Sequence, residues 1–246
     1  MRPDARRTRR PRSKRYEAME NLSAPSVRQE TKGRVVEPAH AHTLPNSWML
    51  NPRLAFLLLF GVGIATFRLE HDIRLTLIWL VLLGLVLLYA ETGRLKGDYS
   101  LLNLVRGATI GAVVALPFFL FNQKFFYATA ARLYSVNDLQ VLIERAVFLV
   151  PVLEGCFFRG MVQHERGLLE GALLFGLAQV LYFISAVNVY PAVIAAVVLG
   201  LTLLGFLCGY LYQRYGLTAS ISCHVAVNLV LFVLPAVVDK INAFLV

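Results

Sequence analysis

Apolar residues fill long runs in the chain after residue 50, and short polar segments separate one run from the next. A helix needs about 20 mostly apolar residues to cross a bilayer, with some allowance for tilt and for buried polar positions. The runs approach or reach that length, so we predict about seven membrane-spanning helices, with a range of six to eight. The predicted spans are 52–67, 75–90, 104–121, 139–158, 168–187, 190–212 and 217–237.

The composition agrees with this pattern. Of the 246 residues, 57% are hydrophobic and only 16% are charged, and the mean hydropathy is +0.62. A soluble domain of this length is normally much less apolar. We therefore predict an all-α, polytopic bundle of transmembrane helices over residues 50–246, and we exclude an ordinary soluble domain.

The first 49 residues differ from the rest of the chain. They contain 11 Lys or Arg residues against 5 Asp or Glu, and they show almost no apolar periodicity. Such a segment buries too little apolar surface to fold alone, so we predict that residues 1–49 form a disordered basic arm. Since the arm is attached to a membrane domain, we expect it to contact anionic lipid headgroups and not nucleic acid.

The arm also sets the expected topology. Basic residues next to a first span favour the cytoplasmic side, so the run at 6–15 places the N-terminus in the cytoplasm. Seven spans then place the C-terminus outside, and the inner loops are 91–103, 159–167 and 213–216. We expect an integral protein of a bacterial inner (plasma) membrane.

Small residues and a proline mark sites of helix packing and bending. Gly107 with Gly111, and Gly205 with Gly209, place glycines on one face of a helix, and a neighbouring helix can then approach closely. We interpret both pairs as packing contacts. Pro151 lies one turn before an acidic residue, and we predict that it kinks the helix and directs that carboxylate inward.

Three short runs place ionisable and amide groups inside the predicted spans of the second half. The runs are 154–160, with Glu154 and Arg159; 175–179, with Phe175 and Gln179; and 224–228, with His224 and Asn228. A charge at the centre of a membrane helix costs about 2.5–3.5 kcal/mol on insertion scales. Groups that are retained at this cost usually form a buried polar site.

The spacing predicts that these groups meet. His224 and Asn228 are four residues apart and share one helix face, and so do Phe175 and Gln179. At a rise of 1.5 Å per residue, the polar groups lie roughly 8–18 Å below the inner surface. We therefore predict that Glu154, Gln179, His224 and Asn228 converge on one polar cavity in the inner half of the bilayer, as in other helical-bundle sites.

The order, spacing and flanks of these runs resemble the CPBP family of intramembrane endopeptidases, which includes the type II CAAX prenyl proteases and the Abi proteins. That family carries the motifs EExxxR, FxxxH and HxxxN on three helices. The resemblance extends over about residues 139–234. The residues that match the motifs are Glu154, Arg159, Phe175, His224 and Asn228. The chain departs from the family at Gly155, in place of the second Glu, and at Gln179, in place of the His of the second motif.

The resemblance implies hydrolysis without a covalent intermediate. Glu154 would be the base that activates water, and His224 and Asn228 would donate hydrogen bonds to the oxyanion. Arg159 would brace the motif at the membrane face and balance its charge. Gln179 stands where the family has a His that assists the base, and an amide can orient water but does not accept a proton near neutral pH.

The two departures leave two hypotheses open, because losing a proton transfer lowers a rate by about 10²–10⁴. The first is a glutamic endopeptidase that hydrolyses a peptide or membrane-protein substrate near the cytoplasmic face. The second is a non-catalytic binding or scaffold protein that retains the site. For a eukaryotic member the resemblance implies prenylated CAAX proteins as substrates, and for a bacterial member a peptide, a sorting-tail protein or an immunity target.

Other interpretations have less support in the sequence. A proton-coupled carrier built on Glu144 and Glu154 should show an inverted repeat or paired broken helices, and neither is evident. A structural role as hydrogen-bonded core residues is the alternative for Glu154 and His224. We predict no cofactor and no metal, because His164-Glu165 lacks the second His of a zinc-binding H-E-x-x-H helix.

Overall fold

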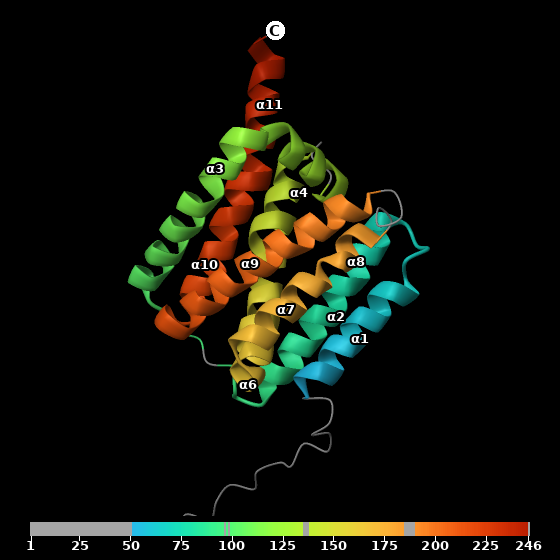
Figure 1. The fold of residues 1–246 in the computed structure, drawn as a ribbon, viewed down its shortest axis with the longest axis vertical. Helices are drawn as coiled ribbons and strands as arrows, with labels where there is room; N and C mark the ends of the chain where they lie inside the picture. Colours follow the sequence, from blue (N-terminus) through green and yellow to red (C-terminus); the bar gives the residue numbers. More distant parts are fainter. Residues whose placement is uncertain (1–50, 96, 98, 135–137, 185–189, 246) are drawn as a thin grey trace, which may run out of the picture. The chain divides into compact units, whose positions relative to one another are not determined.

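The computed structural model describes residues 51–95, 97, 99–134, 138–184 and 190–245, with side chains as far as residue 243. Every regular element within these ranges is a helix (Figure 1), so the all-α prediction is confirmed. The basic arm predicted for residues 1–49 lies outside the described residues, and its disorder remains a prediction.

The helices follow one another with short connections. The first three are α1 (Pro52–Ala65), α2 (His71–Glu91) and α3 (Leu101–Tyr134). Five segments then form one continuous helical stretch: α4 (Leu139–Ile143), the π-helical η1 (Glu144–Leu149), α5 (Val150–Glu154), the π-helical η2 (Gly155–Gln163) and α6 (His164–Arg166). The remaining elements are α7 (Leu168–Ala178), α8 (Val180–Phe183), α9 (Pro191–Tyr215), α10 (Leu217–Asn228), the π-helical η4 (Leu229–Val233) and α11 (Leu234–Leu245).

Four helical stretches in the described part of the chain are long and apolar enough to cross a membrane. They are His71–Glu91, Leu101–Tyr134, Pro191–Tyr215 and Leu217–Ala243. The predicted spans 52–67 and 168–187 correspond to shorter apolar helices, Pro52–Ala65 and Leu168–Phe183. The predicted span 104–121 is the first part of α3, which leaves helical conformation at Asn122 (φ −145°, ψ 46°) and then continues.

The predicted inner loop at 159–167 is wrong. The helix continues through η2 and α6 to Arg166, and the chain turns at Gly167, where φ is 90°. Only glycine adopts such a φ without strain, so the helix ends there. The charge of Arg159 suggested a loop, but this side chain is 2% exposed inside the bundle. The loop predicted at 213–216 is likewise shorter, because α9 extends to Tyr215 and Gly216 makes the turn.

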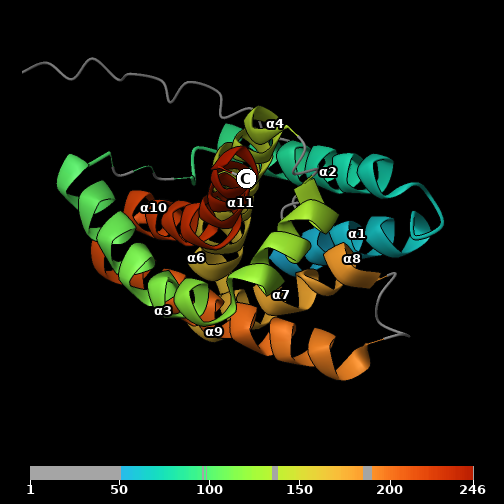
Figure 2. The ribbon, with the colours of Figure 1, turned by 90° about the horizontal axis from the view of Figure 1, so that it is seen from above.

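The stretch 139–166, termed the central helix, is surrounded by other helices. α2, α7 and α10 pack against it, and η2 also contacts α1 and α9. Figure 2 shows α3 and α10 on one side of this helix and α1 and α2 on the other. This position explains why Glu154 and Arg159 are both buried although both side chains are ionisable.

The glycine pair of α3 allows close contact with α10. A Cβ on Gly107 would overlap the carbonyl oxygen of Ala219, and a Cβ on Gly111 would overlap that of Cys223. The backbones of α3 and α10 therefore touch along this stripe. The packing interpretation of this pair is confirmed.

The glycine pair of α9 has the same role against α7 and the central helix. A Cβ on Gly205 would lie 3.1 Å from the carbonyl oxygen of Ala172. At Gly209, the carbonyl oxygen accepts a hydrogen bond of 2.8 Å from Nε2 of the buried Gln163. These contacts hold α9 against the helices that carry the polar motifs.

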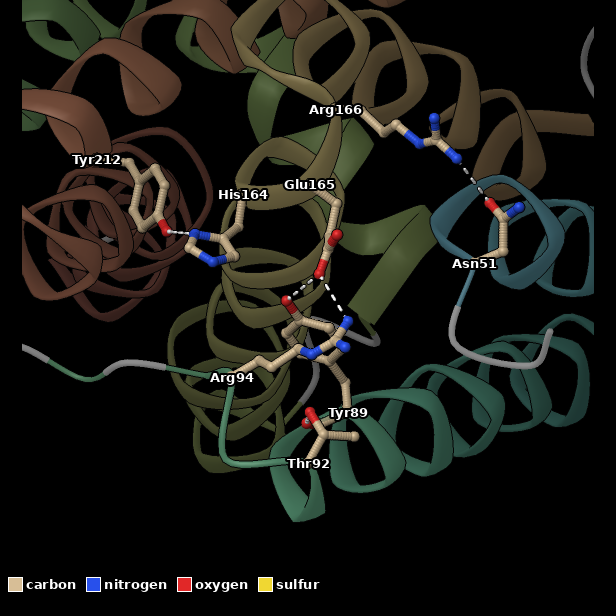
Figure 3. Close-up of polar contacts among 8 residues, drawn as sticks. All are labelled: Asn51, Tyr89, Thr92, Arg94, His164, Glu165, Arg166 and Tyr212. Carbon is tan, nitrogen blue, oxygen red and sulfur yellow. Dashed lines mark hydrogen bonds and ion pairs between the residues drawn. The ribbon is translucent and has the colours of Figure 1, made fainter. Parts of the chain in front are cut away.

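Polar contacts fix the end of the central helix at α6 (Figure 3). Glu165 accepts hydrogen bonds from Oη of Tyr89 at 3.1 Å and from Nη1 of Arg94 at 3.2 Å. The other two contacts join Arg166 to Asn51 at 3.2 Å and His164 to Tyr212 at 3.3 Å. Because the partners come from the start of α1, the end of α2 and the end of α9, these three regions lie at the same end of the bundle.

Candidate active site

The helix that carries Glu154 is irregular on both sides of it. The short α5 ends at Glu154, and the π-helical segments η1 and η2 flank it. Segments of π-helix occur frequently at functional sites, because a widened turn changes where side chains point. Pro151, which lacks an N–H group, lies in the first turn of α5. The sequence predicts a kink at Pro151; the structure shows a change from the π-helical η1 to α5 just before this residue.

Glu154 uses its two carboxylate oxygens differently. Oε1 accepts hydrogen bonds from Nε2 of Gln179 at 3.1 Å and from Oη of Tyr182 at 2.9 Å. Oε2 faces Nε2 of His224 at 3.8 Å, which is too long for a direct hydrogen bond. The structure therefore brings Glu154, Gln179 and His224 together, as the sequence analysis predicted.

These side chains form a closed cluster. The exposed fractions are 2% for Glu154, 4% for His224 and 8% for Gln179. A separate cavity of about 200 Å³ lies between the second part of α3 and the start of α9, and its lining is mainly apolar. The three side chains of the cluster are thus buried, and Glu154 contacts Gln179 directly.

A tightened turn aims two side chains of the second motif at Glu154. The N–H of Gln179 donates to the carbonyl of Gly176, and the N–H of Tyr182 donates to the carbonyl of Gln179. Both bonds span three residues, as in a 3₁₀-helix, where side chains at i and i+3 lie above one another. Gln179 and Tyr182 therefore reach the same carboxylate oxygen.

Arg159 and His224 lie on two sides of Phe175. The Arg159 guanidinium lies 4.1 Å from the centroid of the Phe175 ring, and the rings of Phe175 and His224 meet edge to face at 5.6 Å. A cation over an aromatic face is stabilised by the ring quadrupole. Both Nη atoms of Arg159 lack a hydrogen-bond partner within the described residues. Arg159 therefore lies inside the bundle against Phe175, and its role at the membrane face stays a prediction.

Asn228 points to a different part of the central helix. Its Nδ2 donates a hydrogen bond of 2.7 Å to the carbonyl oxygen of Ala146 in η1. No hydrogen bond joins Asn228 to Glu154 in the part of the chain that the structure describes. In this arrangement Asn228 holds α10 against η1 and lies four residues beyond His224.

Sequence reasoning missed two residues of this cluster. Tyr182 contacts Glu154 directly, and Nε1 of Trp79 in α2 donates a hydrogen bond of 3.2 Å to the Tyr182 hydroxyl. Tyr182 had a local signal, because it follows Gln179 by three residues and shares its helix face. Trp79 had none, because 103 residues separate it from Tyr182.

Gly155, which replaces the second Glu of the first motif, lies against α10. A Cβ at this position would lie 2.5 Å from Cγ1 of Ile221. The absence of a side chain is therefore a packing requirement in this chain. A side chain at position 155 would require the Ile221 side chain of α10 to move.

We expect Gly155→Ala to destabilise the protein by about 1–3 kcal/mol through overpacking, although Ala is intrinsically the better helix former by about 1 kcal/mol. Thermal unfolding of the purified protein in lipid measures this. Gly84→Ala is the matched control, since a Cβ there meets nothing within 4 Å. Adding Ile221→Ala to Gly155→Ala should recover part of the lost stability. A Gly155→Ala protein as stable as the Gly84→Ala protein would contradict the packing account.

The described residues contain no group of three or more His, Cys, Asp and Glu side chains arranged to hold a metal ion.

The sequence model of a protein family described as "Type II CAAX prenyl endopeptidase Rce1-like" matches residues 137–230. This match confirms the resemblance and covers Glu154, Gln179, His224 and Asn228. Comparison of the chain with curated proteins and with solved structures found no match.

Proposed function

Because residues 137–230 match the type II CAAX prenyl endopeptidase Rce1-like family, we propose that this protein is an intramembrane glutamic endopeptidase. The observation that supports this most directly is the 3.8 Å separation between Glu154 Oε2 and His224 Nε2. An oxygen atom about 2.8 Å from each, an ordinary hydrogen-bond distance, completes a triangle with them. A water molecule or a substrate oxygen can thus contact a base and a donor at once.

The proposed reaction needs only these protein groups and water. Glu154 Oε2 removes a proton from the attacking water while the water oxygen bonds to the carbonyl carbon of the scissile peptide. His224 donates a hydrogen bond to the oxyanion that develops on the carbonyl oxygen. The C–N bond then breaks, and the proton held by Glu154 passes to the leaving amine. Glu154 is regenerated as the carboxylate.

The surrounding residues support the charge changes in this sequence. Gln179 holds Oε1 and leaves Oε2 directed at His224. The positive charge of Arg159 is close enough to attract the Glu154 carboxylate. Since Asn228 is bonded to Ala146, its role as an oxyanion donor requires that this bond be exchanged when substrate enters. The closed cluster likewise requires a helix movement that admits a peptide.

The second candidate function is a membrane-bound binding or scaffold protein. Two observations favour it. Gln179 occupies the position where the family has the His that assists the base, and the side chains around Glu154 are less than 10% exposed. In that case the hydrogen bonds to Glu154 would stabilise the helix bundle, and a membrane partner would bind to another surface.

An experiment that does not require a known substrate separates the two functions. Membranes from cells that produce either the wild-type protein or Glu154→Gln are compared by mass spectrometry for new peptide ends. If the protein is an endopeptidase, new peptide ends in membrane proteins should appear only in cells that produce the wild type. New ends that are equally abundant with Glu154→Gln would exclude the glutamate mechanism. No new ends, with a partner captured equally by both proteins, would favour the scaffold.

We further propose that the N-terminus lies in the cytoplasm of a bacterial cell and that α6 lies at the same side of the inner membrane. The contact of Arg166 with Asn51 supports a shared side for α6 and the start of α1, because it joins the two; the cytoplasmic side follows from the basic residues of the arm. The end of α2, with Arg94, lies there as well. Glu154 is 12 residues before Arg166 on the central helix, which is about 18 Å at 1.5 Å per residue, so the site would lie near the middle of the roughly 30 Å hydrocarbon core, deeper than the sequence predicted.

Seven spans predict opposite sides for the two termini. A reporter fused to the N-terminus should be protected from protease added to intact cells with a permeabilised outer membrane, and a reporter at the C-terminus should be cleaved. Disruption of the inner membrane should expose both reporters. Protection of both reporters in intact cells would mean an even number of spans, most simply because the short helix α1 does not cross.

A further inference from the structure

Tyr182 lies at the centre of a buried chain of hydrogen bonds that ends at Glu154. Its hydroxyl contacts Glu154 on one side and Trp79 on the other, at 2.9 Å and 3.2 Å. Tyr182 and Trp79 are each 5% exposed. Its carbonyl oxygen is contacted by Nη2 of the buried Arg74 at 3.5 Å. Tyr182 is thus held through both its backbone and its hydroxyl.

The chemistry of the three groups determines which of them donates and which accepts in each hydrogen bond. The indole N–H of Trp79 only donates, so the Tyr182 oxygen must accept that hydrogen bond. A phenol has a single proton, and its remaining partner at hydrogen-bond distance is Oε1 of Glu154. An ionised carboxylate only accepts, so the Tyr182 O–H donates to Glu154, and the Trp79 N–H fixes the position of the same hydroxyl oxygen.

This orientation makes the two oxygens of Glu154 unequal. Oε1 accepts from both Tyr182 and Gln179, and both donors are fixed by the tightened turn at Gln179. Hydrogen bonds to an ionised group are stronger than those between neutral groups. A carboxylate held at one oxygen by two donors keeps its plane fixed, and Oε2 stays directed at His224.

We propose that Tyr182, oriented by Trp79, is a positioning residue that holds the Glu154 carboxylate and makes Oε2 the oxygen that takes the proton from water. This inference rests on the proposed endopeptidase function. Trp79 lies outside residues 137–230, the segment that matches the family. A residue of α2 thus helps to position the Glu154 carboxylate through Tyr182.

A double-mutant cycle in the full-length protein, reconstituted in lipid, tests the proposal. Tyr182→Phe removes the donor to Oε1, and we expect kcat to fall about ten- to hundredfold, the effect of a hydrogen bond to a charged group, with little change in KM. Trp79→Phe removes the N–H donor to Tyr182 together with part of a buried ring, and we expect a smaller fall in kcat than for Tyr182→Phe. Because Trp79 acts through Tyr182, the double variant should be no slower than Tyr182→Phe alone.

The structure offers a matched control for this cycle. Tyr89 is also buried, and its hydroxyl also donates to a carboxylate, that of Glu165, at 3.1 Å. Tyr89→Phe should leave kcat and KM unchanged. If Trp79→Phe fails to fold, β-(3-benzothienyl)alanine at position 79 retains the bicyclic shape without the N–H and replaces it in the cycle.

The possible outcomes separate this proposal from the proposed function. Additive effects of Tyr182→Phe and Trp79→Phe, or an unchanged kcat in Tyr182→Phe while Glu154→Gln is inactive, would overturn the positioning role and leave the endopeptidase intact. Wild-type turnover in Glu154→Gln would overturn the endopeptidase and the positioning role with it. If the wild-type protein cleaves nothing, infrared difference spectra can test the hydrogen bond from Tyr182 to Glu154 instead, because the frequency of the Glu154 carboxylate band depends on it. A band unchanged by both Tyr182→Phe and Trp79→Phe would overturn the inferred hydrogen bonds.

Discussion

Cleavage is expected to fall by about 10²–10⁴-fold when Glu154 is replaced by glutamine, the range for removal of a general base. The amide has nearly the same size and can still form hydrogen bonds with Gln179 and Tyr182, so the bundle should remain folded. It cannot take the proton from water, however. The measurement is the initial rate of cleavage by purified protein in lipid, with a membrane substrate identified from its new peptide ends.

Glu165→Gln is the matched control for this experiment. Glu165 is on the same central helix and also accepts a hydrogen bond from a tyrosine hydroxyl, but it lies at the α6 end, away from His224. Its replacement should change the cleavage rate by less than the error of the assay. The loss of the ion pair with Arg94 should lower the stability of the protein only slightly. Equal losses in the two variants would mean that carboxylates on this helix are needed for folding and not for the reaction.

Gln179→His is expected to raise turnover by about 10²-fold, the lower end of the range for a positioned acid or base. The imidazole would replace an amide that already lies 3.1 Å from Oε1 of Glu154. It can donate to the carboxylate as the amide does, and it can also accept and return a proton near neutral pH. Single-turnover measurements with the same substrate report this step without contribution from product release.

Two comparisons make this second prediction specific. Gln140→His also changes a glutamine that donates to a glutamate, Glu144 at 2.8 Å, but on an exposed surface. It should not alter turnover. Gln179→His in a Glu154→Gln background should remain inactive, because the imidazole assists Glu154 and does not replace it. A fall in turnover in Gln179→His would show that the amide itself is required in this chain.

Several features of the chain could be predicted from sequence because they depend on neighbours along the chain. Hydropathy in a window of about 20 residues identifies helices that can cross a membrane, whichever other helices surround them. The i, i+4 spacing of Phe175 with Gln179 and of His224 with Asn228 determines a shared face on each helix. A common depth then brought Glu154, Gln179 and His224 into one layer, and the structure places them in contact.

The errors arose where hydropathy alone was ambiguous. The transfer of a charge from water to an apolar environment is unfavourable whether lipid or protein provides that environment, so Arg159 suggested the end of a helix. In the structure the stacking of Arg159 on Phe175 stabilises its charge inside the bundle. Gly155 similarly looked like a lost carboxylate, but the nearness of Ile221 makes it a close-packed contact between helices.

Most helical segments and the polar residues that share a face could be read from the sequence, because both depend on residues within a few turns. The end of the central helix and the contacts of each polar group came from the packing of the bundle. The bond from Asn228 to Ala146 and the chain from Trp79 through Tyr182 to Glu154 join residues that are 82, 103 and 28 positions apart. Such pairings follow from the rotation and register of packed helices, which depend on side chains throughout the bundle and leave no periodic signal in any one of them.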